Sequence, residues 1–190
     1  MKSAHFDNAF TGLEAAIVLI AFVVVASVFA YVILGAGFFT TQKSQEVIHT
    51  GVEQASSTLQ VSGNVYGTGT PGVSIDTINF TVGLAAGGSA IDFDKVSITY
   101  SNSSSLETLQ HITPTGTTIS GGQWVIGAVQ NQMTADDVLE KGEQFEISAK
   151  PTHPILKDNQ FSLEIKPAVG SSFSISRTVP ASIQGVNVLY

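Results

Sequence analysis

The sequence predicts an α+β protein, in which one long apolar α-helix at the N-terminus is followed by an antiparallel β-sandwich. The stretch of residues 15–42 contains no charged residue. After Gly63 the apolar residues change from helical to alternating spacing, and turn-forming residues recur at short intervals. We therefore expect three parts: a short leading segment, residues 1–9, a helix, residues 10–60, and a β domain, residues 61–190.

The composition argues against nucleic-acid binding. The chain has 190 residues and a net charge of −7, and its eight Lys and Arg residues are scattered rather than gathered into a stripe. No basic surface is therefore available to neutralise phosphates, so nucleic acid is not expected as a partner. Cysteine is absent, which excludes disulfides and thiolate metal sites.

The apolar run is long enough to cross a lipid bilayer. Residues 15–39 are almost wholly apolar, and about 20 apolar residues in a helix span a hydrocarbon core. A cleavable secretory signal has a shorter apolar region, of roughly 7 to 15 residues, before a small-residue cleavage site. Gly35-Ala36-Gly37 is similar to such a site, but the run is too long and only Lys2 supplies a positive charge before it. We expect the segment to remain on the protein and to reside in a membrane at some stage.

A short motif lies directly before this run. It reads Asn8-Ala9-Phe10-Thr11-Gly12-Leu13-Glu14. Together with the apolar residues that follow and Leu34-Gly35-Ala36-Gly37-Phe38-Phe39, it resembles the N-terminus of archaeal flagellins (archaellins), which belong to the type IV pilin superfamily. The resemblance extends to about residue 60. It implies that a prepilin-type membrane peptidase cuts between Ala9 and Phe10, leaving the helix as the assembly element. One departure is that such leaders usually place a basic residue and a glycine before the cut, where this chain has Asp7-Asn8-Ala9.

Glu14 lies at the edge of the apolar helix, and two roles are open for it. A carboxylate there is costly unless it is paired, hydrogen-bonded or close to the interface. The resemblance to pilins implies that its partner is the free amine of Phe10 on a neighbouring subunit. General membrane physics suggests instead that Glu14 marks the water boundary and stabilises the helix N-terminus through the helix dipole. The sequence leaves both open.

Several residues of the run suit helix packing. Ala26, Ser27 and Ala30 allow close approach, and large side chains such as Phe22 and Phe29 fill the remaining space. Gly12 and Glu14 stand where many archaellins have a glycine and many bacterial pilins have a glutamate. Gly12, Glu14, Phe22, Ala26, Phe29 and Ala30 form the predicted assembly set. A lone anchor surrounded by lipid would tolerate the same composition.

The second half of the helix is predicted to be amphipathic and to end near Leu59. Ile48, Val52, Ala55 and Leu59 recur at helical spacing. At 1.5 Å per residue, a helix over residues 13–59 would be roughly 70 Å long, which exceeds the thickness of a membrane. This half must therefore pack on protein, either on neighbouring helices or on the chain's own β domain.

Seven strands are expected at the regular spacing typical of an immunoglobulin-like sandwich. They are residues 77–84, 95–100, 124–129, 144–149, 161–166, 173–179 and 186–189. Residues 67–72 are expected to form a loop, because Gly, Thr and Pro alternate there. This run formally matches a dinucleotide-binding glycine pattern, but a strand rather than a helix follows it, so no cofactor is expected. Trp124 is expected in the core.

No catalytic motif is visible, and we expect a protein that is not an enzyme. The histidines at positions 5, 49, 111 and 153 lie far apart, and no Gly-x-Ser-x-Gly or His-Glu-x-x-His motif occurs. The acidic segment 136–143 offers hard oxygen ligands, so Ca²⁺ binding there, helped by Asp92 and Asp94, is one possibility. The alternative is a solvated turn before the next strand, which the family resemblance favours.

Two N-glycosylation sequons are present, Asn79-Phe80-Thr81 and Asn102-Ser103-Ser104. Asn102 falls in a serine-rich predicted loop. Asn79 falls in a predicted strand and must point outward to be modified. Archaellins are often glycosylated, so the resemblance favours both asparagines.

The resemblance implies a structural subunit of the archaeal flagellum (archaellum), which polymerises with itself or with other archaellins for swimming. The precursor would reside in the cytoplasmic membrane, and the filament would be extracellular, on the cell surface. A cytoplasmic ATPase and a membrane platform, which are not part of this chain, would export the subunits and rotate the filament. Two alternatives stay open: an adhesion pilin, and a membrane-anchored extracellular β-sandwich accessory protein. Gly12 and residues 34–37 favour the archaellin.

Overall fold

The computed structural model describes residues 4–113 and 119–190, with side chains from residue 12 onward. The chain divides into two compact units, Met1–Thr50 and Gly51–Tyr190. In the first, residues 4–50 are helical. The second contains the last helical turn and the strands.

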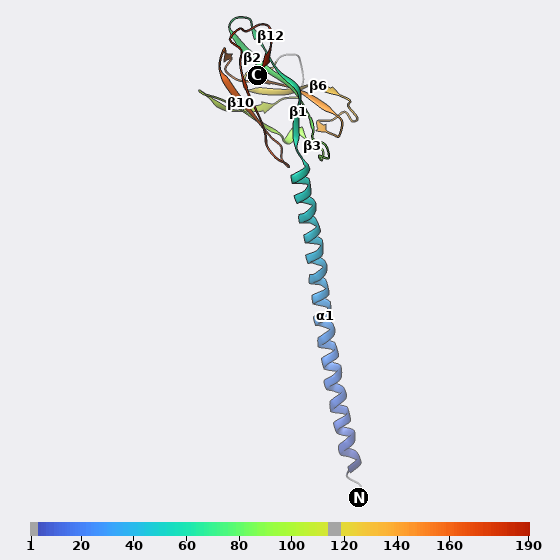
Figure 1. The fold of residues 1–190 in the computed structure, drawn as a ribbon. Coiled ribbons are helices and arrows are strands. Elements are labelled where there is room, and N and C mark those ends of the chain that lie inside the picture. Colours follow the sequence, from blue (N-terminus) through green and yellow to red (C-terminus); the bar gives the residue numbers. More distant parts are fainter. Residues whose placement is uncertain (1–3, 114–118) are drawn as a thin grey trace. The chain divides into compact units, whose positions relative to one another are not determined.

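The helix α1 runs over Ala4–Ser56 without interruption (Figure 1). Proline is absent from this stretch, and the glycines within it lower helix propensity only modestly. The helix ends before Leu59, where it was expected to end, because Leu59 pairs with Leu84 in an antiparallel ladder. Its side chain is only 1% exposed in the sandwich core. The predicted amphipathic stripe is therefore restricted to Ile48, Val52 and Ala55.

Short strands and one 3-10 turn make up the β domain. In chain order they are β1 (Leu59–Thr70), β2 (Ser74–Leu84), β3 (Ile91–Asp92), the 3-10 turn η1 (Phe93–Lys95), β4 (Ser97–Asn102), β5 (Leu106–His111), β6 (Gln123–Gln130), β7 (Val138–Leu139), β8 (Gln144–Lys150), β9 (Ile155–Leu156), β10 (Gln160–Lys166), β11 (Phe173–Thr178) and β12 (Val186–Leu189).

The strands form two layers around one core. The order of the large sheet is β11-β10-β4-β5-β6-β8-β2-β1-β12, with β9 beside β2, while β3 and β7 form a separate pair. Only the short β5–β6 contact is parallel among the described strand pairs. Side chains on both sides of that contact, such as Ile98 and Ile147, belong to a single buried cluster. The predicted fold class, a helix followed by an antiparallel-rich β-sandwich, is confirmed.

Main-chain hydrogen bonds also join the two ends of the large sheet. Thr178, at the end of β11, and Tyr190, just after β12, each donate an N–H to the other's carbonyl. Paired backbone at a sheet edge is unavailable for uncontrolled pairing with another chain. The β domain therefore completes much of its own hydrogen bonding.

The predicted loop at residues 67–72 is wrong in its first part. Gly67 and Gly69 lie in β1, and the turn begins only at Pro71. A Cβ on Gly67 would lie 2.6 Å from Cδ1 of Ile75, and one on Gly69 would lie 2.7 Å from the Ile75 Cα. The glycines are therefore strand residues that let β2 approach closely.

Strand β5 was also missed by the sequence analysis. Of its residues only Leu109 is buried, at 3% exposure, whereas Leu106 is 78% exposed. A strand with one core residue has almost no alternation to detect. Its position becomes clear only from its pairing with β4.

Trp124 lies in the core, as predicted, and is 0% exposed. The Phe93 ring packs edge-on against it at 6.3 Å between centroids, and the His111 ring stacks on it at 4.1 Å. The indole fills the interior rather than offering a binding platform.

Candidate functional site

The apolar part of α1 is the most unusual surface of the molecule. Large apolar side chains over residues 13–39 are 53–79% exposed in the single chain. The helix is long and apolar enough to cross a membrane. An exposed apolar surface of this extent marks a contact with lipid or with protein, because soluble monomers rarely leave patches of more than a few hundred Å² uncovered.

The serine and threonine hydroxyls in this segment and directly after it are satisfied by the helix itself. Ser27 Oγ donates to the Val24 carbonyl at 2.7 Å. Thr40 and Thr41 donate in the same way to the carbonyls four residues earlier, at 2.8 and 2.9 Å. A polar group bonded to its own backbone needs no water and no partner from another helix. Burial of these three hydroxyls in a dry environment therefore costs little.

The predicted assembly residues with described side chains lie along this surface. Phe22 and Phe29 are 74% and 64% exposed. Ala30 lines a shallow apolar groove with Ile33, Leu34, Gly37, Phe38 and Thr41, and Phe22 lines another with Glu14, Ala15, Val18 and Leu19. Apart from its chain neighbours and the adjacent helix backbone, a Cβ built on Gly12 or Gly37 would meet no atom within 4 Å. The helix thus presents bulky side chains and small-residue grooves, the complementary features that packed helices use.

Glu14 is exposed and borders one of these grooves. Among the residues that the structure describes, its carboxylate has no hydrogen-bond or ion-pair partner. The predicted cleavage site, Ala9 and Phe10, precedes the described side chains. The backbone there is helical.

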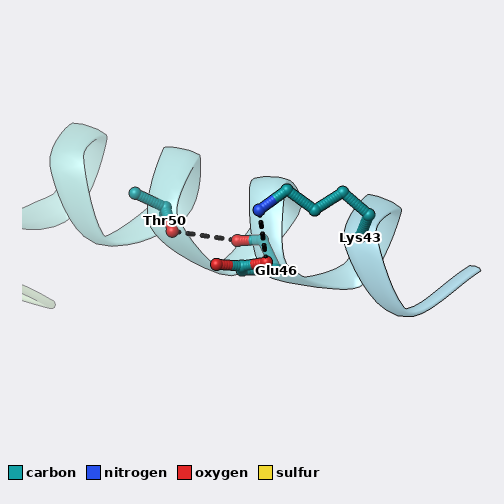
Figure 2. A network of polar contacts seen from close by, with 3 residues as sticks. All are labelled: Lys43, Glu46 and Thr50. Atoms are coloured by element: carbon teal, nitrogen blue, oxygen red, sulfur yellow. Dashed lines mark hydrogen bonds and ion pairs between the residues drawn. The ribbon is translucent and has the colours of Figure 1, made fainter. Parts of the chain in front are cut away.

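After Glu14, the next charged side chains on α1 appear only where the apolar segment has ended. Figure 2 shows Lys43, Glu46 and Thr50 on successive turns. The Lys43 ammonium pairs with Glu46 at 2.7 Å, and Thr50 Oγ1 donates to the Glu46 carbonyl at 2.9 Å. Both members of the ion pair are at least 60% exposed, so the pair marks a hydrated stretch and adds little stability. Val47, Ile48 and Val52 nearby are still 60–62% exposed.

The last turn of α1 is bonded into the β domain. The Ser57 carbonyl accepts the N–H of Ser171 at 3.2 Å, and the Ser56 and Ser89 hydroxyls lie 3.1 Å apart. A Cβ on Gly170 would overlap Ser57, and its backbone φ of +117° favours glycine. Sequence reasoning missed this joint, because its partners are small loop residues far apart in the chain.

The two acidic segments suggested for Ca²⁺ do come together, since β3 pairs with β7. Their carboxylates are largely used by the chain itself. Asp92 pairs with Lys95 at 2.7 Å, and buried Glu143 accepts the N–H groups of Met133 and Glu140. Those two bonds hold the pKa of Glu143 below its ordinary value. Within the described chain no group of three or more His, Asp or Glu side chains could hold a metal ion. Ca²⁺ binding stays an untested prediction.

The histidines with described side chains do not meet. His111 stacks on Trp124, with Nδ1 3.7 Å from an Asp94 oxygen, while His49 and His153 are exposed elsewhere. These three histidines therefore do not form a common site.

The chain joins an exposed apolar helix to a β domain that has its own core. This combination is typical of a class of proteins that use an N-terminal helix to anchor in a membrane or to assemble with other subunits. Comparison with known proteins identifies the family. The archaeal-type flagellin model matches residues 9–177. The chain belongs to this family.

Similar proteins cover nearly the whole chain. It is 39% identical to Probable flagellin 1 of Archaeoglobus fulgidus, over 100% of this chain and 98% of that protein. Among solved structures, a subunit of the archaeal flagellum of Methanospirillum hungatei is 36% identical, with a TM-score of 0.73 over 94% of this chain and 99% of the other. The archaeal flagellin FlaB1 of Methanocaldococcus jannaschii shares the fold, with a TM-score of 0.60 over 69% and 95%, at 19% identity.

Proposed function

We propose that this chain, a structural subunit of the archaellum filament, serves swimming motility by polymerising through the apolar face of α1. The observation that carries the proposal is the bare apolar surface of residues 13–39, whose side chains are 53–79% exposed. The whole-chain similarity to a subunit of the Methanospirillum hungatei archaeal flagellum supports it. Family membership favours this role over the adhesion pilin and the accessory protein.

Burial of that surface supplies the driving force for assembly. Each Å² of apolar surface removed from water contributes about 25 cal/mol. The hydroxyls of Ser27, Thr40 and Thr41 already bond to the helix backbone, so burial leaves no polar group of theirs unpaired. These three side chains therefore need no new polar contacts in a bundle of such helices, and the same helix can rest in lipid beforehand.

The precursor is held in the cytoplasmic membrane and is cut between Ala9 and Phe10 by a prepilin-type peptidase. Two features support this step: the motif around Phe10, and the family match, which begins at residue 9. Export and rotation are carried out by the archaellum's own membrane machinery. The chain itself acts by packing and not as an enzyme.

Glu14 recruits the new N-terminus of a neighbouring subunit. Its carboxylate is exposed and has no partner among the described residues, and it borders an apolar groove. A charge in such a place gains most from a counter-ion at close range. The free amine of Phe10 on another copy would supply that charge.

Mass spectrometry of filaments sheared from the cell surface tests the scheme. We expect the N-terminal peptide to begin at Phe10. Deletion of the chain should abolish swimming, whereas loss of attachment with intact swimming would point to an adhesion pilin. An N-terminal peptide that retains Met1, or a protein found only as dispersed monomers in the membrane, would contradict the proposal.

A Glu14→Gln variant, compared with Glu46→Gln on the hydrated part of the helix, tests the charge pairing. Glu14→Gln should lower filament yield at least tenfold at unchanged membrane content, because the amide carries no charge. Glu46→Gln should leave the yield unchanged. Equal yields from both variants would support the alternative, in which Glu14 only marks the water boundary.

A further inference from the structure

Arg177 is the single arginine of the chain, and it lies on the core-facing side of the edge strand β11. It continues the inward row of Phe173 and Ile175, and it is paired with the buried Phe161 of β10. A charge in such a row is costly unless it reaches water or a counter-ion. Arg177 is half-buried, so its side chain leads out of the core at the open end of the row.

The Arg177 guanidinium has no anionic partner within the described chain. Its Nη1 donates to the carbonyl of Ser176 at 2.8 Å. A guanidinium carries five N–H donors in a planar fork that matches the two oxygens of a carboxylate. Most of these donors are therefore available to a partner outside the chain.

A groove of about 390 Å³ opens beside Arg177. It lies between β11, the end of β12 at Val188 and Tyr190, and the part of β1 at Gly63 and Asn64. The register of β1 shifts at this point, and Gly63 has a φ of +83°, which is typical of a β-bulge. The strands thus leave an opening large enough to admit a side chain of another molecule.

An acidic loop projects from another part of the same domain. Residues 130–136, which lead from the end of β6 toward β7, form the longest run of consecutive exposed residues in the described β domain. Asp136 ends this run. Its Oδ1 accepts the N–H of Val138 at 3.2 Å, and its second carboxylate oxygen has no partner in the part of the chain that the structure describes.

The loop is held in shape from within the domain. Buried Glu143 accepts the N–H of Met133 at 2.6 Å and the N–H of Glu140 at 3.0 Å. Asn131 Nδ2 donates to the Gly142 carbonyl at 3.4 Å. A loop that is ordered before binding loses little conformational entropy when it meets a partner. The Asp136 carboxylate is therefore presented in a defined position.

The loop and the groove are separate sites on one chain. No residue of the loop lines the groove, and Figure 1 shows β12 and β3, the partner strand of β7, toward opposite ends of the β domain. Complementary sites at different places on one chain join copies head to tail, and a repeated head-to-tail contact builds an open helical polymer. A second copy of the chain is therefore the occupant that fits the groove.

We propose that Arg177 in the groove of one subunit binds the Asp136 carboxylate of a neighbouring subunit. The inference rests on the proposed function, because the contact forms only between polymerised subunits. The apolar helices drive assembly. The ion pair between β domains strengthens the assembled filament and fixes the orientation of the neighbour.

Exchange of the two charges tests the pair. Arg177→Glu should lower the fraction of subunits that stay in the filament pellet after mild heating by at least about twofold, because two carboxylates then face each other. Asp136→Arg should lower it by a similar factor. The double variant Arg177→Glu/Asp136→Arg restores opposite charges and should return the fraction to the wild-type value. Lys166→Glu, which replaces an exposed cation on β10, changes the net charge equally and should have no effect.

Crosslinking tests the contact without relying on filament stability. The chain has no cysteine, so Arg177→Cys/Asp136→Cys introduces two unique thiols. A short bismaleimide added to intact filaments should join these subunits into a ladder of dimers and larger species on a denaturing gel. The control Arg177→Cys/Glu164→Cys, in which the second thiol is on the exposed side of β10, should stay mostly monomeric.

Three results would overturn the inference: no rescue in the double charge variant, an equal loss in Lys166→Glu, or monomers alone from both crosslinked filaments. Crosslinks to a protein other than this chain would also overturn it. In each case wild-type filaments still form, so the proposed function stands. An absence of filaments from wild-type cells would instead count against the proposed function.

Discussion

The helix and the β domain are both rich in apolar residues but place them in opposite environments. In α1 the large side chains over residues 13–39 are 53–79% exposed, whereas the core residues of the β domain are at most 7% exposed. The β domain also pairs its sheet ends through Thr178 and Tyr190. One region therefore completes its structure within a single chain, and the other needs lipid or further copies of the chain. The apolar residues of the β domain therefore serve folding, and those of the helix serve assembly.

The largest expected effect comes from a charge placed on the helix. Asp in place of Phe29 should abolish filaments, because an ionised side chain at the centre of an apolar helix costs about 2.5–3.5 kcal/mol in each subunit. The measurement is the amount of filament that pellets after shearing. Leu106→Asp is the matched control, since Leu106 is 78% exposed on β5 and should tolerate the charge. Loss of filaments in both variants would contradict the claim that only the apolar surface of the helix is needed for assembly.

Removal of a core ring is the next largest effect and should act on folding. Trp124→Ala should destabilise the β domain by about 3–5 kcal/mol, because it leaves a large cavity. Trp124→Phe should cost less, since the buried indole N–H has no partner among the described residues. Thermal unfolding of the full chain in detergent measures both. Phe22→Ala on the helix should leave the unfolding transition of the β domain unchanged. An equal loss of stability in Phe22→Ala would contradict the separation of the helix from the folding of the β domain.

An acid-dependent loss of stability is expected from Glu143. Because the N–H groups of Met133 and Glu140 hold its pKa below the ordinary 4.5, the carboxylate stabilises the fold above that pH. The contribution is lost as the pH falls through the lower, folded-state pKa. Glu143→Gln should destabilise the domain by about 1.5–3 kcal/mol at neutral pH and flatten the acid dependence. Glu146→Gln on the same strand serves as control, and an unchanged acid profile in Glu143→Gln would refute this role.

The smallest effects are expected from replacing one glycine in each region by alanine. Gly67→Ala should destabilise the β domain by at least about 1 kcal/mol, because the new methyl group would overlap Cδ1 and Cγ2 of the buried Ile75. Gly37→Ala meets no atom within 4 Å and should raise helix stability by about 0.5–1 kcal/mol. Circular dichroism in detergent follows both changes. If Gly37→Ala destabilises the single chain, the face of the helix around Gly37 must already be in contact with another part of the molecule.

The main features of both regions were predictable from the sequence. The uncharged run over residues 15–42 and the alternation around Phe161, Leu163 and Ile165 are signals between residues close in the chain. Such local periodicity predicted a helix and an antiparallel β domain, and the size of the Trp124 side chain predicted that it is buried. The residues around Gly12 and Glu14 were enough to suggest the family.

The sequence did not show what depends on distant partners. It placed Gly67 and Gly69 in a loop, because glycine is a turn residue until Ile75 is known to lie against it. It missed β5, whose one buried leucine makes no pattern, and the joint of Ser57 with Ser171.

The apolar helix, the division into helix and β domain, and the presence of two sequons were thus determined by the sequence alone. Which carboxylate is buried and where the helix ends were decided by the tertiary structure. The physical reason is that periodicity and motifs are local properties, whereas hydrogen bonds such as Ser148 to Asn79 join residues that only the fold brings together.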